Sequence, residues 1–218
     1  MHSADCTMKK PRTEIILVKY NNFAYEYETV MSVLECTEEP YNLTIYDNYE
    51  NDENLSTVWN RLIGRSDAEY ICLLNTDVNV QKGWLSKLLA VFDREAHTGA
   101  VGPVTNSCGV KLHLVDPTAD YKVFDVTDLS AFCIVFPRHL WLGVGGFNEE
   151  YHLYGEDSEF VARIIDAGYK LKIRSDVFIY HYGGKSMEVA KERGKDIDKI
   201  RQKSKSTYKK FYESRNNN

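Results

Sequence analysis

Three short strand-like segments in the first third of the chain are each followed by a polar tip. The segments are residues 14–18, 42–46 and 70–74, and their tips are Asn21-Asn22, Asp47-Asn48 and Asn75-Thr76-Asp77. Stretches with helical spacing separate the segments, so the alternation predicts parallel strands joined by right-handed crossovers. Ligands of such sheets bind at the carboxyl ends of the strands. We therefore expect the three tips to line one binding site, although each tip taken alone is also an ordinary turn.

The remaining pattern extends this α/β arrangement along the chain. Helices are predicted over residues 24–36, 54–63 with Asn54 as N-cap, 83–92, and from Gly155-Glu156-Asp157 to Gly168. Further strands are predicted over residues 100–104, 131–136, 170–174 and 177–180, with an irregular stretch at 105–128. The tail from Met187 onward is predicted to form one packed amphipathic helix.

The fold class that follows is α/β, with a Rossmann-like, mostly parallel sheet flanked by helices and a C-terminal amphipathic helix. A length of 218 residues suits one core better than two, so we expect a single domain over 1–218. Within it, residues 1–12 are expected to be a flexible N-terminus and residues 187–218 a basic helix and tail.

The net charge of −5 conceals an asymmetry between the body and the tail. Residues 185–218 hold 11 Lys and Arg against 5 Asp and Glu, so the rest of the chain carries 16 basic and 27 acidic residues. An acidic body argues against a nucleic-acid partner, which requires basic faces. The basic tail favours contact with an anionic membrane, a diphosphate or an adjoining domain, and a solvated helix face explains it equally well.

The five cysteines are scattered without a CxxC pair, which argues against a disulfide framework or a zinc cluster and favours a reducing compartment. The first ten residues lack the apolar core of a signal peptide, and no apolar run approaches the length of a membrane span. We therefore expect the protein to be cytoplasmic.

Carboxylates at two places suit chemistry on a phosphorylated ligand. Asp77 directly follows a buried strand, and Mg²⁺ and Mn²⁺ prefer oxygen ligands and take one or two protein carboxylates. Glu156 and Asp157 begin a predicted helix, whose dipole favours their ionised forms, and a carboxylate is a common general base. The simpler explanations are a turn cap for Asp77 and a helix-start charge for Asp157.

The order of these motifs resembles the family 2 glycosyltransferases, which are inverting enzymes with the GT-A fold. The resemblance runs from about Glu14 to Ser186. It rests on the Asp47-Asn48 tip, the Asn75-Thr76-Asp77 turn, Gly145-Gly146-Phe147-Asn148-Glu149, Gly155-Glu156-Asp157 and the late His181.

The resemblance implies a role for each of these residues. Asp47 would bind the uracil of a UDP-sugar donor, with Tyr20 stacking near the base and Asn75-Thr76 beside the nucleotide. Asp77 and His181 would hold Mn²⁺ or Mg²⁺ at the diphosphate, and Lys185 and Ser186 would close over the phosphates. Asp157 would be the catalytic base, with Glu156 orienting the acceptor, a glycan or other hydroxyl compound. The segment Ser130-Ala131-Phe132-Cys133 would lie beside the donor sugar, where bulky Phe132 would shape selectivity.

Two departures from the family pattern affect the donor side. Asn75 stands where the motif usually has aspartate, which weakens one metal or ribose contact. Lys19-Tyr20-Asn21 replaces the more usual Thr-Tyr-Asn after the first strand.

Two other functions stay open at this point. A sugar nucleotidyltransferase would need a glycine-rich phosphate loop after the first strand, where this chain has residues 19–23, KYNNF. A catalytically silent nucleotide-sugar or glycan-binding module would not need the Glu156-Asp157 pair. His181 could also be an ordinary structural histidine.

Overall fold

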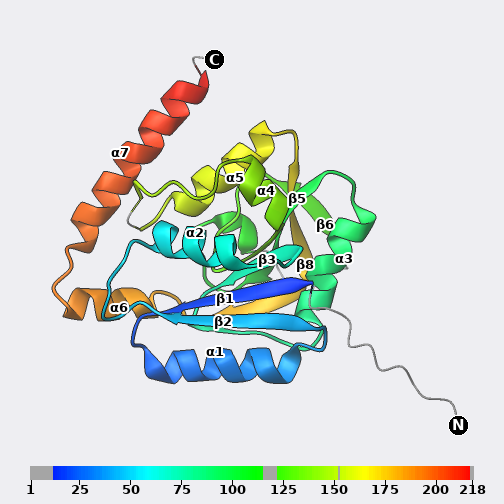
Figure 1. The fold of residues 1–218 in the computed structure, drawn as a ribbon, viewed down its shortest axis with the longest axis horizontal. Helices are drawn as coiled ribbons and strands as arrows, with labels where there is room; N and C mark the ends of the chain where they lie inside the picture. The colour runs from blue at the N-terminus through cyan, green and yellow to red at the C-terminus, as the bar shows by residue number, and fades with distance from the viewer. Residues whose placement is uncertain (1–11, 115–121, 152, 217–218) are drawn as a thin grey trace, which may run out of the picture.

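A computed structural model describes residues 12–114, 122–151 and 153–216 (Figure 1). The strands are β1 (Thr13–Lys19), β2 (Tyr41–Asp47), β3 (Tyr70–Leu74), β4 (Val78–Asn79), β5 (Thr98–Thr105), β6 (Val123–Val126), β7 (Cys133–Pro137) and β8 (Lys170–His181). The helices are α1 (Phe23–Cys36), α2 (Leu55–Arg65), α3 (Trp84–Arg94), α4 (Arg138–Gly143), α5 (Glu156–Asp166), α6 (Lys185–Glu192) and α7 (Ile197–Asn216), with a 3-10 turn at Lys111–His113. Most of the predicted N-terminal segment, residues 1–12, lies outside the described residues; Arg12 lies within them and pairs with Glu69.

The strands form one mixed sheet in the order β2-β1-β3-β7-β5-β8-β4, with β6 paired to β8. β1 is parallel to β2 and β3, and β5 is parallel to β8, which confirms the predicted crossovers in the first half of the chain. β7 is inserted antiparallel between β3 and β5. The apolar pattern of a buried strand does not encode its direction, so the sequence could not reveal this insertion.

Side chains alternate between two apolar cores, one on each face of the sheet. On β3, Ile71 and Leu73 enter the core beneath α2, α4 and α5, whereas Cys72 and Leu74 enter the core beneath α1 and α3. Figure 1 shows these two helix layers on opposite sides of the sheet. Both faces are therefore covered, which is why β3 and β7 are apolar at every position.

Several predictions about elements are corrected by the structure. β4, β6 and α4 were not predicted, and β6 lies in the stretch expected to be irregular. Two strands predicted at residues 170–180 are the single strand β8, whose expected break coincides with a shift of register against β5. Two helix boundaries are confirmed, because the Asn54 side chain caps α2 and Gly168 has φ +87° just after α5.

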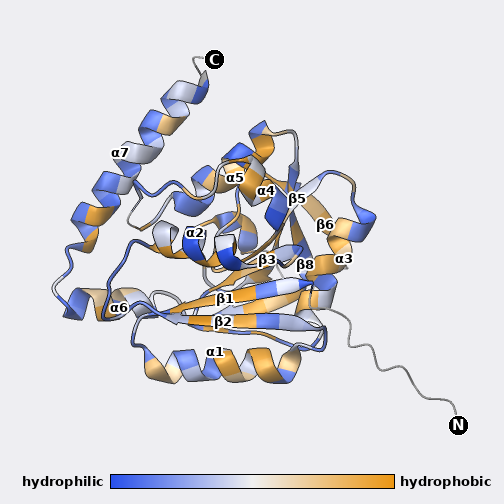
Figure 2. Ribbon diagram, in the orientation of Figure 1, coloured by the Kyte–Doolittle hydropathy of each residue, from blue (hydrophilic) through white to orange (hydrophobic). Residues whose placement is uncertain are grey.

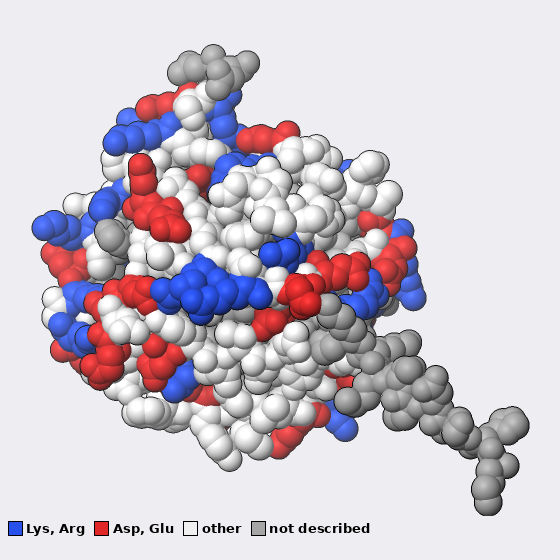
Figure 3. Space-filling view, in the orientation of Figure 1, with Lys and Arg blue, Asp and Glu red and all other residues white. Residues whose placement is uncertain are grey.

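The tail forms two helices rather than one packed helix. α6 ends before Gly194, whose φ of +80° turns the chain into α7. Among the described side chains of α7 only Ile197 and Ser204 are buried, so the helix is mostly exposed and leaves the body at the upper left of Figure 1. Figure 3 shows lysines and arginines along it. The predicted contact with a membrane or an adjoining domain stays a prediction, and none of the described helices is long and apolar enough to cross a bilayer.

Candidate active site

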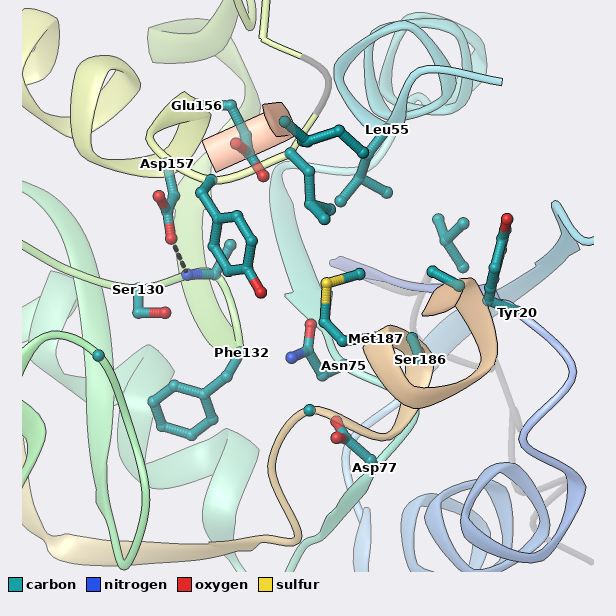
Figure 4. A pocket seen from close by; sticks show the side chains of 18 of the residues that line it. Tyr20, Leu55, Asn75, Asp77, Ser130, Phe132, Glu156, Asp157, Ser186 and Met187 are labelled. Atoms are coloured by element: carbon teal, nitrogen blue, oxygen red, sulfur yellow. Dashed lines mark hydrogen bonds between the residues drawn. The ribbon is translucent and has the colours of Figure 1, made fainter. Parts of the chain in front are cut away.

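A pocket of about 980 Å³ opens at the carboxyl ends of β1 and β3, beneath α6 and the start of α7 (Figure 4). Most of the residues that were predicted from the sequence to form the site line it. These are Tyr20, Asn75, Thr76, Asp77, Glu156, Asp157, His181 and Ser186. Asn48 and residues 130–132 contribute to the lining as well. Asp47 and Lys185 do not, and both are treated below.

Asp77 and His181 meet because the short strand β4 pairs with the end of β8. Val78 lies opposite His181 in this pairing. Asp77, the residue before Val78, therefore places its carboxylate against the imidazole of His181. Asp77 Oδ1 lies 3.2 Å from His181 Nε2, and both residues are at least nine-tenths buried. Two residues that are 104 positions apart in the sequence are thus in direct contact.

The protonation of His181 follows from its other ring nitrogen. Nδ1 lies 2.7 Å from the carbonyl oxygen of Ser107, which can only accept, so Nδ1 carries a proton. Nε2 donates to Asp77 Oδ1 when it carries a proton, and without that proton its lone pair can serve as a metal ligand while Nδ1 stays bonded to Ser107. The ring is also stacked on Phe132 with centroids 5.2 Å apart, which fixes its plane.

The carboxylate of Asp77 is held ionised. Burial opposes ionisation, but the contact with His181 and the hydrogen bond from the backbone N–H of Lys185 to Oδ2 (3.1 Å) outweigh it, so the pKa of Asp77 is lowered. One carboxylate and one imidazole are a suitable partial donor set for Mn²⁺ or Mg²⁺, which complete their shells with phosphate and water. Among the described residues, no group of three or more acidic, histidine or cysteine side chains forms a complete protein cage.

The segment that begins α6 brings polar groups to the same place. Gly183 and Gly184 have φ of +77° and +74°, a conformation that favours glycine, and they turn the chain from β8 into the helix. Ser186 Oγ accepts a hydrogen bond from Asn22 Nδ2 at 3.2 Å, which ties α6 to the tip of β1. The N-terminus of α6 thus lies against Asp77.

The side chain of Lys185 is placed differently from the prediction. Its ammonium pairs with Glu188 at 2.8 Å and lies 5.2 Å from the ring centroid of Tyr25, away from the pocket lining. Only the backbone N–H of Lys185 reaches the site, where it binds Asp77. A role for its charge at the phosphates would require the ammonium to leave Glu188.

Asp157 occupies the other end of the pocket, in the first turn of α5. Its Oδ2 accepts the backbone N–H of Ala131 at 3.0 Å, and its Oδ1 accepts that of Ser158 at 2.9 Å. Burial raises the pKa of Asp157, and these hydrogen bonds act in the opposite direction. Figure 4 shows the carboxylate beside Ser130, on the wall of the pocket opposite Asp77.

Glu156 contradicts the expectation that the helix dipole keeps both carboxyl groups ionised. Its side chain is 5% exposed, and Oε2 is buried without a hydrogen-bond partner among the described residues. Burial, together with the neighbouring charge of Asp157, raises its pKa to about 8. Desolvation therefore outweighs the dipole, and a neutral Glu156 is a hydrogen-bond donor in the pocket at pH 7.

This burial predicts a pH-dependent cost to stability. Between the unfolded pKa near 4.5 and the folded pKa near 8, the folded state binds the Glu156 proton more tightly, so stability falls as pH rises through this window. Glu156→Gln has no ionised form and should therefore be more stable than the wild type, by a margin in Tm that grows from pH 5 to pH 8.5. About 2–4 °C is expected per kcal/mol regained.

Thermal unfolding of both proteins across this range measures the margin. Glu150→Gln, at an exposed glutamate nearby, is the matched control and should leave the pH profile unchanged. A constant difference in Tm between Glu156→Gln and the wild type at all pH values would contradict the raised pKa.

Two residues that contact the wall of the pocket were missed by the sequence analysis because they lie in the stretch without periodicity. Asp128 accepts a hydrogen bond from Ser158 Oγ at 3.1 Å, and burial and the charge of Asp157 raise its pKa to about 6. Buried His113 holds the wall segment in place, because its Nε2 accepts the backbone N–H of Ser130 at 3.0 Å. Its ring also packs edge-on against Phe132.

The end of the pocket that lies next to β1 is built around Tyr20. Its hydroxyl donates to Asp52 Oδ1 at 2.6 Å, and Asp52 also pairs with Lys195 from the α6–α7 turn. Arg193 from the same turn stacks over the ring of Tyr49, 4.3 Å from its centroid. Tyr20, Asp52 and Lys195 line the pocket, and only the first was predicted.

Asp47 lies outside this lining, with its side chain 59% exposed. It accepts a hydrogen bond from Lys19 Nζ at 3.4 Å and from the backbone N–H of Tyr49 at 3.0 Å. Of the three predicted tips, the structure therefore brings only Asn75-Thr76-Asp77 to the pocket in full. After β1 the lining contains Tyr20 rather than Asn21 and Asn22, and after β2 it contains Asn48 rather than Asp47. The proposed contact between Asp47 and a base stays a prediction.

Comparison with known sequences gives one family. The sequence pattern of the family described as "Glycosyl transferase family 2" matches residues 7–129, which is more than half of the chain. That range covers β1 to β6 and includes Tyr20 and the Asn75-Thr76-Asp77 turn. No curated protein sequence matches the chain.

Solved structures show the same fold at low sequence identity. GalNAc-T7 with UDP, GalNAc and Mn²⁺ superposes with a TM-score of 0.62 at 11% identity, over 80% of this chain and 44% of that one. The mannosyltransferase PcManGT of Pyrobaculum calidifontis, in complex with GDP-Man and Mn²⁺, gives 0.63 at 16%, over 80% and 57%. S. aureus TarS 1–349 gives 0.58 at 17%, over 82% and 63%. The chain thus has the GT-A fold of these proteins and spans between two-fifths and two-thirds of their length.

Proposed function

The chain belongs to glycosyl transferase family 2, and from this membership and the geometry of the pocket we propose that it is an inverting, metal-dependent glycosyltransferase. It would move a hexose or deoxyhexose from a UDP-sugar to a hydroxyl group of a glycan. The observation that carries this proposal is that one pocket holds the Asp77–His181 pair at one end and Asp157 at the other.

Asp77 and His181 would hold the divalent cation. An ionised carboxylate and an imidazole whose Nδ1–H is fixed by the Ser107 carbonyl, so that Nε2 can turn its lone pair to a metal, both favour a cation between them. Bound there, Mn²⁺ or Mg²⁺ would neutralise charge on the departing diphosphate. The solved structures of GalNAc-T7 and PcManGT each contain a sugar nucleotide or its parts together with Mn²⁺, which supports the same ligands here.

Asp157 would act as the general base. The acceptor oxygen attacks the anomeric carbon on the face opposite the nucleotide, the bond from that carbon to the diphosphate oxygen breaks, and the acceptor proton passes to Asp157. The hydrogen bonds from Ala131 and Ser158 hold the carboxylate in a fixed orientation, while its burial raises its pKa toward that of a useful base. Neutral Glu156 would donate a hydrogen bond to an acceptor hydroxyl.

The nucleoside would bind at the other side of the cation, near Tyr20. An aromatic ring with a fixed hydroxyl offers a stacking surface for uracil, and Asp52 supplies a carboxylate beside it. Asp52 lines the pocket and Asp47 does not, so Asp52 is the better-placed carboxylate for the base or ribose. Ser186 would contact the phosphates from the start of α6.

A thermal-shift panel of nucleotide sugars with and without Mn²⁺ tests this function. A donor at 100 times its Kd stabilises the folded state by about 2.7 kcal/mol, which corresponds to about 5–10 °C in Tm for a chain of this size. We expect a shift of this size from a UDP-sugar with Mn²⁺ and a much smaller one with EDTA.

Mn²⁺ alone and each sugar without its nucleotide are the controls. The GDP-sugar arm distinguishes the expected uridine donor from a guanosine donor such as the one bound by PcManGT. If no nucleotide sugar changes Tm at millimolar concentration, the proposed function is wrong.

A further inference from the structure

The outer edge of β2 is an open strand edge without the usual protections. β2 is the last strand on its side of the sheet, and within the described residues β1 is its only partner. Its seven residues, YNLTIYD, are regularly paired to β1 throughout and include no lysine, proline or glycine. Natural proteins normally block such edges with charges, prolines or bulges, because unpaired N–H and C=O groups recruit another strand.

An apolar stripe on α1 runs beside this edge. Phe23 and Tyr27 are each 68% exposed and Leu34 is 53% exposed, and on β2 itself Ile45 is 44% exposed. We call these four residues and the free edge of β2 the β2-edge surface. Much of α1 is coloured as hydrophobic in Figure 2, although the helix lies at the border of the molecule.

Contacts at both sides of α1 fix the direction in which the stripe faces. Lys19 Nζ lies 5.8 Å from the ring centroid of Phe23 and 3.4 Å from the carboxylate of Asp47, so the stripe begins next to the end of β2. Glu28, about 100° around the helix from Tyr27, accepts a hydrogen bond from Tyr182 after β8. The side of α1 that carries Glu28 thus faces the segment after β8, and the start of the stripe at Phe23 lies at the end of β2.

We propose that the β2-edge surface binds a second copy of this chain, with β2 of one copy antiparallel to β2 of the other about a two-fold axis. The two sheets would join into one continuous sheet, and the α1 stripes would pack against each other on one face. The proposal rests on the strand edge and the stripe alone, and it does not depend on the proposed function.

The sequence of β2 is self-complementary in the register that pairs all seven residues. In that register Thr44 faces Thr44, Leu43 faces Ile45, Asn42 faces Tyr46 and Tyr41 faces Asp47 of the other copy. The only charged residue, Asp47, therefore faces a tyrosine rather than another carboxylate, and the exposed Ile45 gains an apolar neighbour. A second copy of β2 can therefore pair with the free N–H and C=O groups of the edge without placing two like charges opposite each other. This complementarity favours a second copy over an unrelated strand.

The exposed apolar side chains of this surface supply part of the area of such an interface. Phe23 and Tyr27, with side chains of about 150–250 Å² each that are two-thirds exposed, alone offer roughly 250 Å² per copy. Leu34, Ile45 and an edge roughly 23 Å long add to this, toward the ~800 Å² per partner of a stable interface. No residue of β2 lines the pocket, so each copy would keep a complete site.

A disulfide test identifies both the partner and the register. In the proposed pairing only residue 44 faces itself, at a Cα separation of about 4.5–5.5 Å, which suits a disulfide. Thr44→Cys should therefore form covalent dimers under mild oxidation. Asn42→Cys is the matched control on the same face of the same strand. It should not cross-link, because the two cysteines introduced at position 42 would lie roughly four strand positions apart, or about 13 Å.

Light scattering on the full chain supplies an independent measurement. The wild type should show twice the monomer mass of 25.1 kDa at micromolar concentration. Ile45→Lys, which adds a charge to the edge, should return the mass to 25.1 kDa, whereas Leu142→Lys, at another exposed leucine, should leave the dimer intact. A monomeric wild type at 100 µM, a dimer that survives Ile45→Lys, or equal cross-linking of Thr44→Cys and Asn42→Cys would overturn the proposal.

Discussion

Replacement of Asp157 by asparagine should lower turnover by about 10²- to 10⁴-fold, the contribution of a positioned general base. The asparagine side chain has nearly the same shape, and its oxygen can still accept the hydrogen bond from Ala131, whereas its NH₂ group cannot accept the one from Ser158. The wall segment therefore keeps its hydrogen bond to α5 while the proton acceptor is lost. Affinity for UDP should stay nearly unchanged, because Asp157 lies at the opposite end of the pocket from Asp77 (Figure 4).

Turnover is measured as UDP released at saturating donor and acceptor, and UDP affinity is measured by calorimetric titration. Asp93→Asn, at an exposed aspartate on α3, is the matched control for the substitution itself and should behave as the wild type. Full turnover in Asp157→Asn would remove this residue from the base role. Equal losses of turnover and of UDP affinity would indicate a structural role instead.

The sequence predicted the first half of the fold well because its signals there are local. Apolar runs of five residues that end in Asn or Asp mark β1, β2 and β3, and the helices between them have clear spacing. Tip residues of parallel strands meet at one edge, which is why Tyr20, Asn75 and Asp77 could be placed together without a structure.

The sequence did not predict contacts between residues that lie far apart along the chain. The pairing of Asp52 with Lys195 depends on the turn at Gly194, which divides what looked like one helical tail into α6 and α7. Asp128 and His113 lie in a stretch without periodicity, so no pattern marked them. Asp128 lies in the connection from β6 to β7, and His113 is held by its contacts with the Pro103 carbonyl and the backbone N–H of Ser130.

The charge state of the site also depended on burial rather than on residue type. Glu156 and Asp157 are adjacent and share one helix terminus, yet only Glu156 has its pKa raised to about 8. Asp157 keeps two backbone N–H donors, while Glu156 Oε2 has none within the described residues. A rule based on the helix dipole alone treats both alike and therefore misassigns the neutral residue.

The second prediction concerns Asp77. Asp77→Asn should weaken binding of UDP in the presence of Mn²⁺ by at least about 100-fold, or about 2.8 kcal/mol. The amide is a poor ligand for a hard cation, and a divalent cation supplies much of the attraction for a diphosphate. Without Mn²⁺ the substitution should not weaken binding and should improve it slightly, because it removes a carboxylate that repels the phosphates.

Calorimetric titration of UDP into the wild type and Asp77→Asn, each with Mn²⁺ and with EDTA, is the most direct test of a metal-held nucleotide at the Asp77–His181 pair. The account predicts tight binding only for the wild type with Mn²⁺, and weak binding in the other three titrations. Equal UDP affinity of the wild type with Mn²⁺ and with EDTA, or an undiminished response to Mn²⁺ in Asp77→Asn, would contradict it.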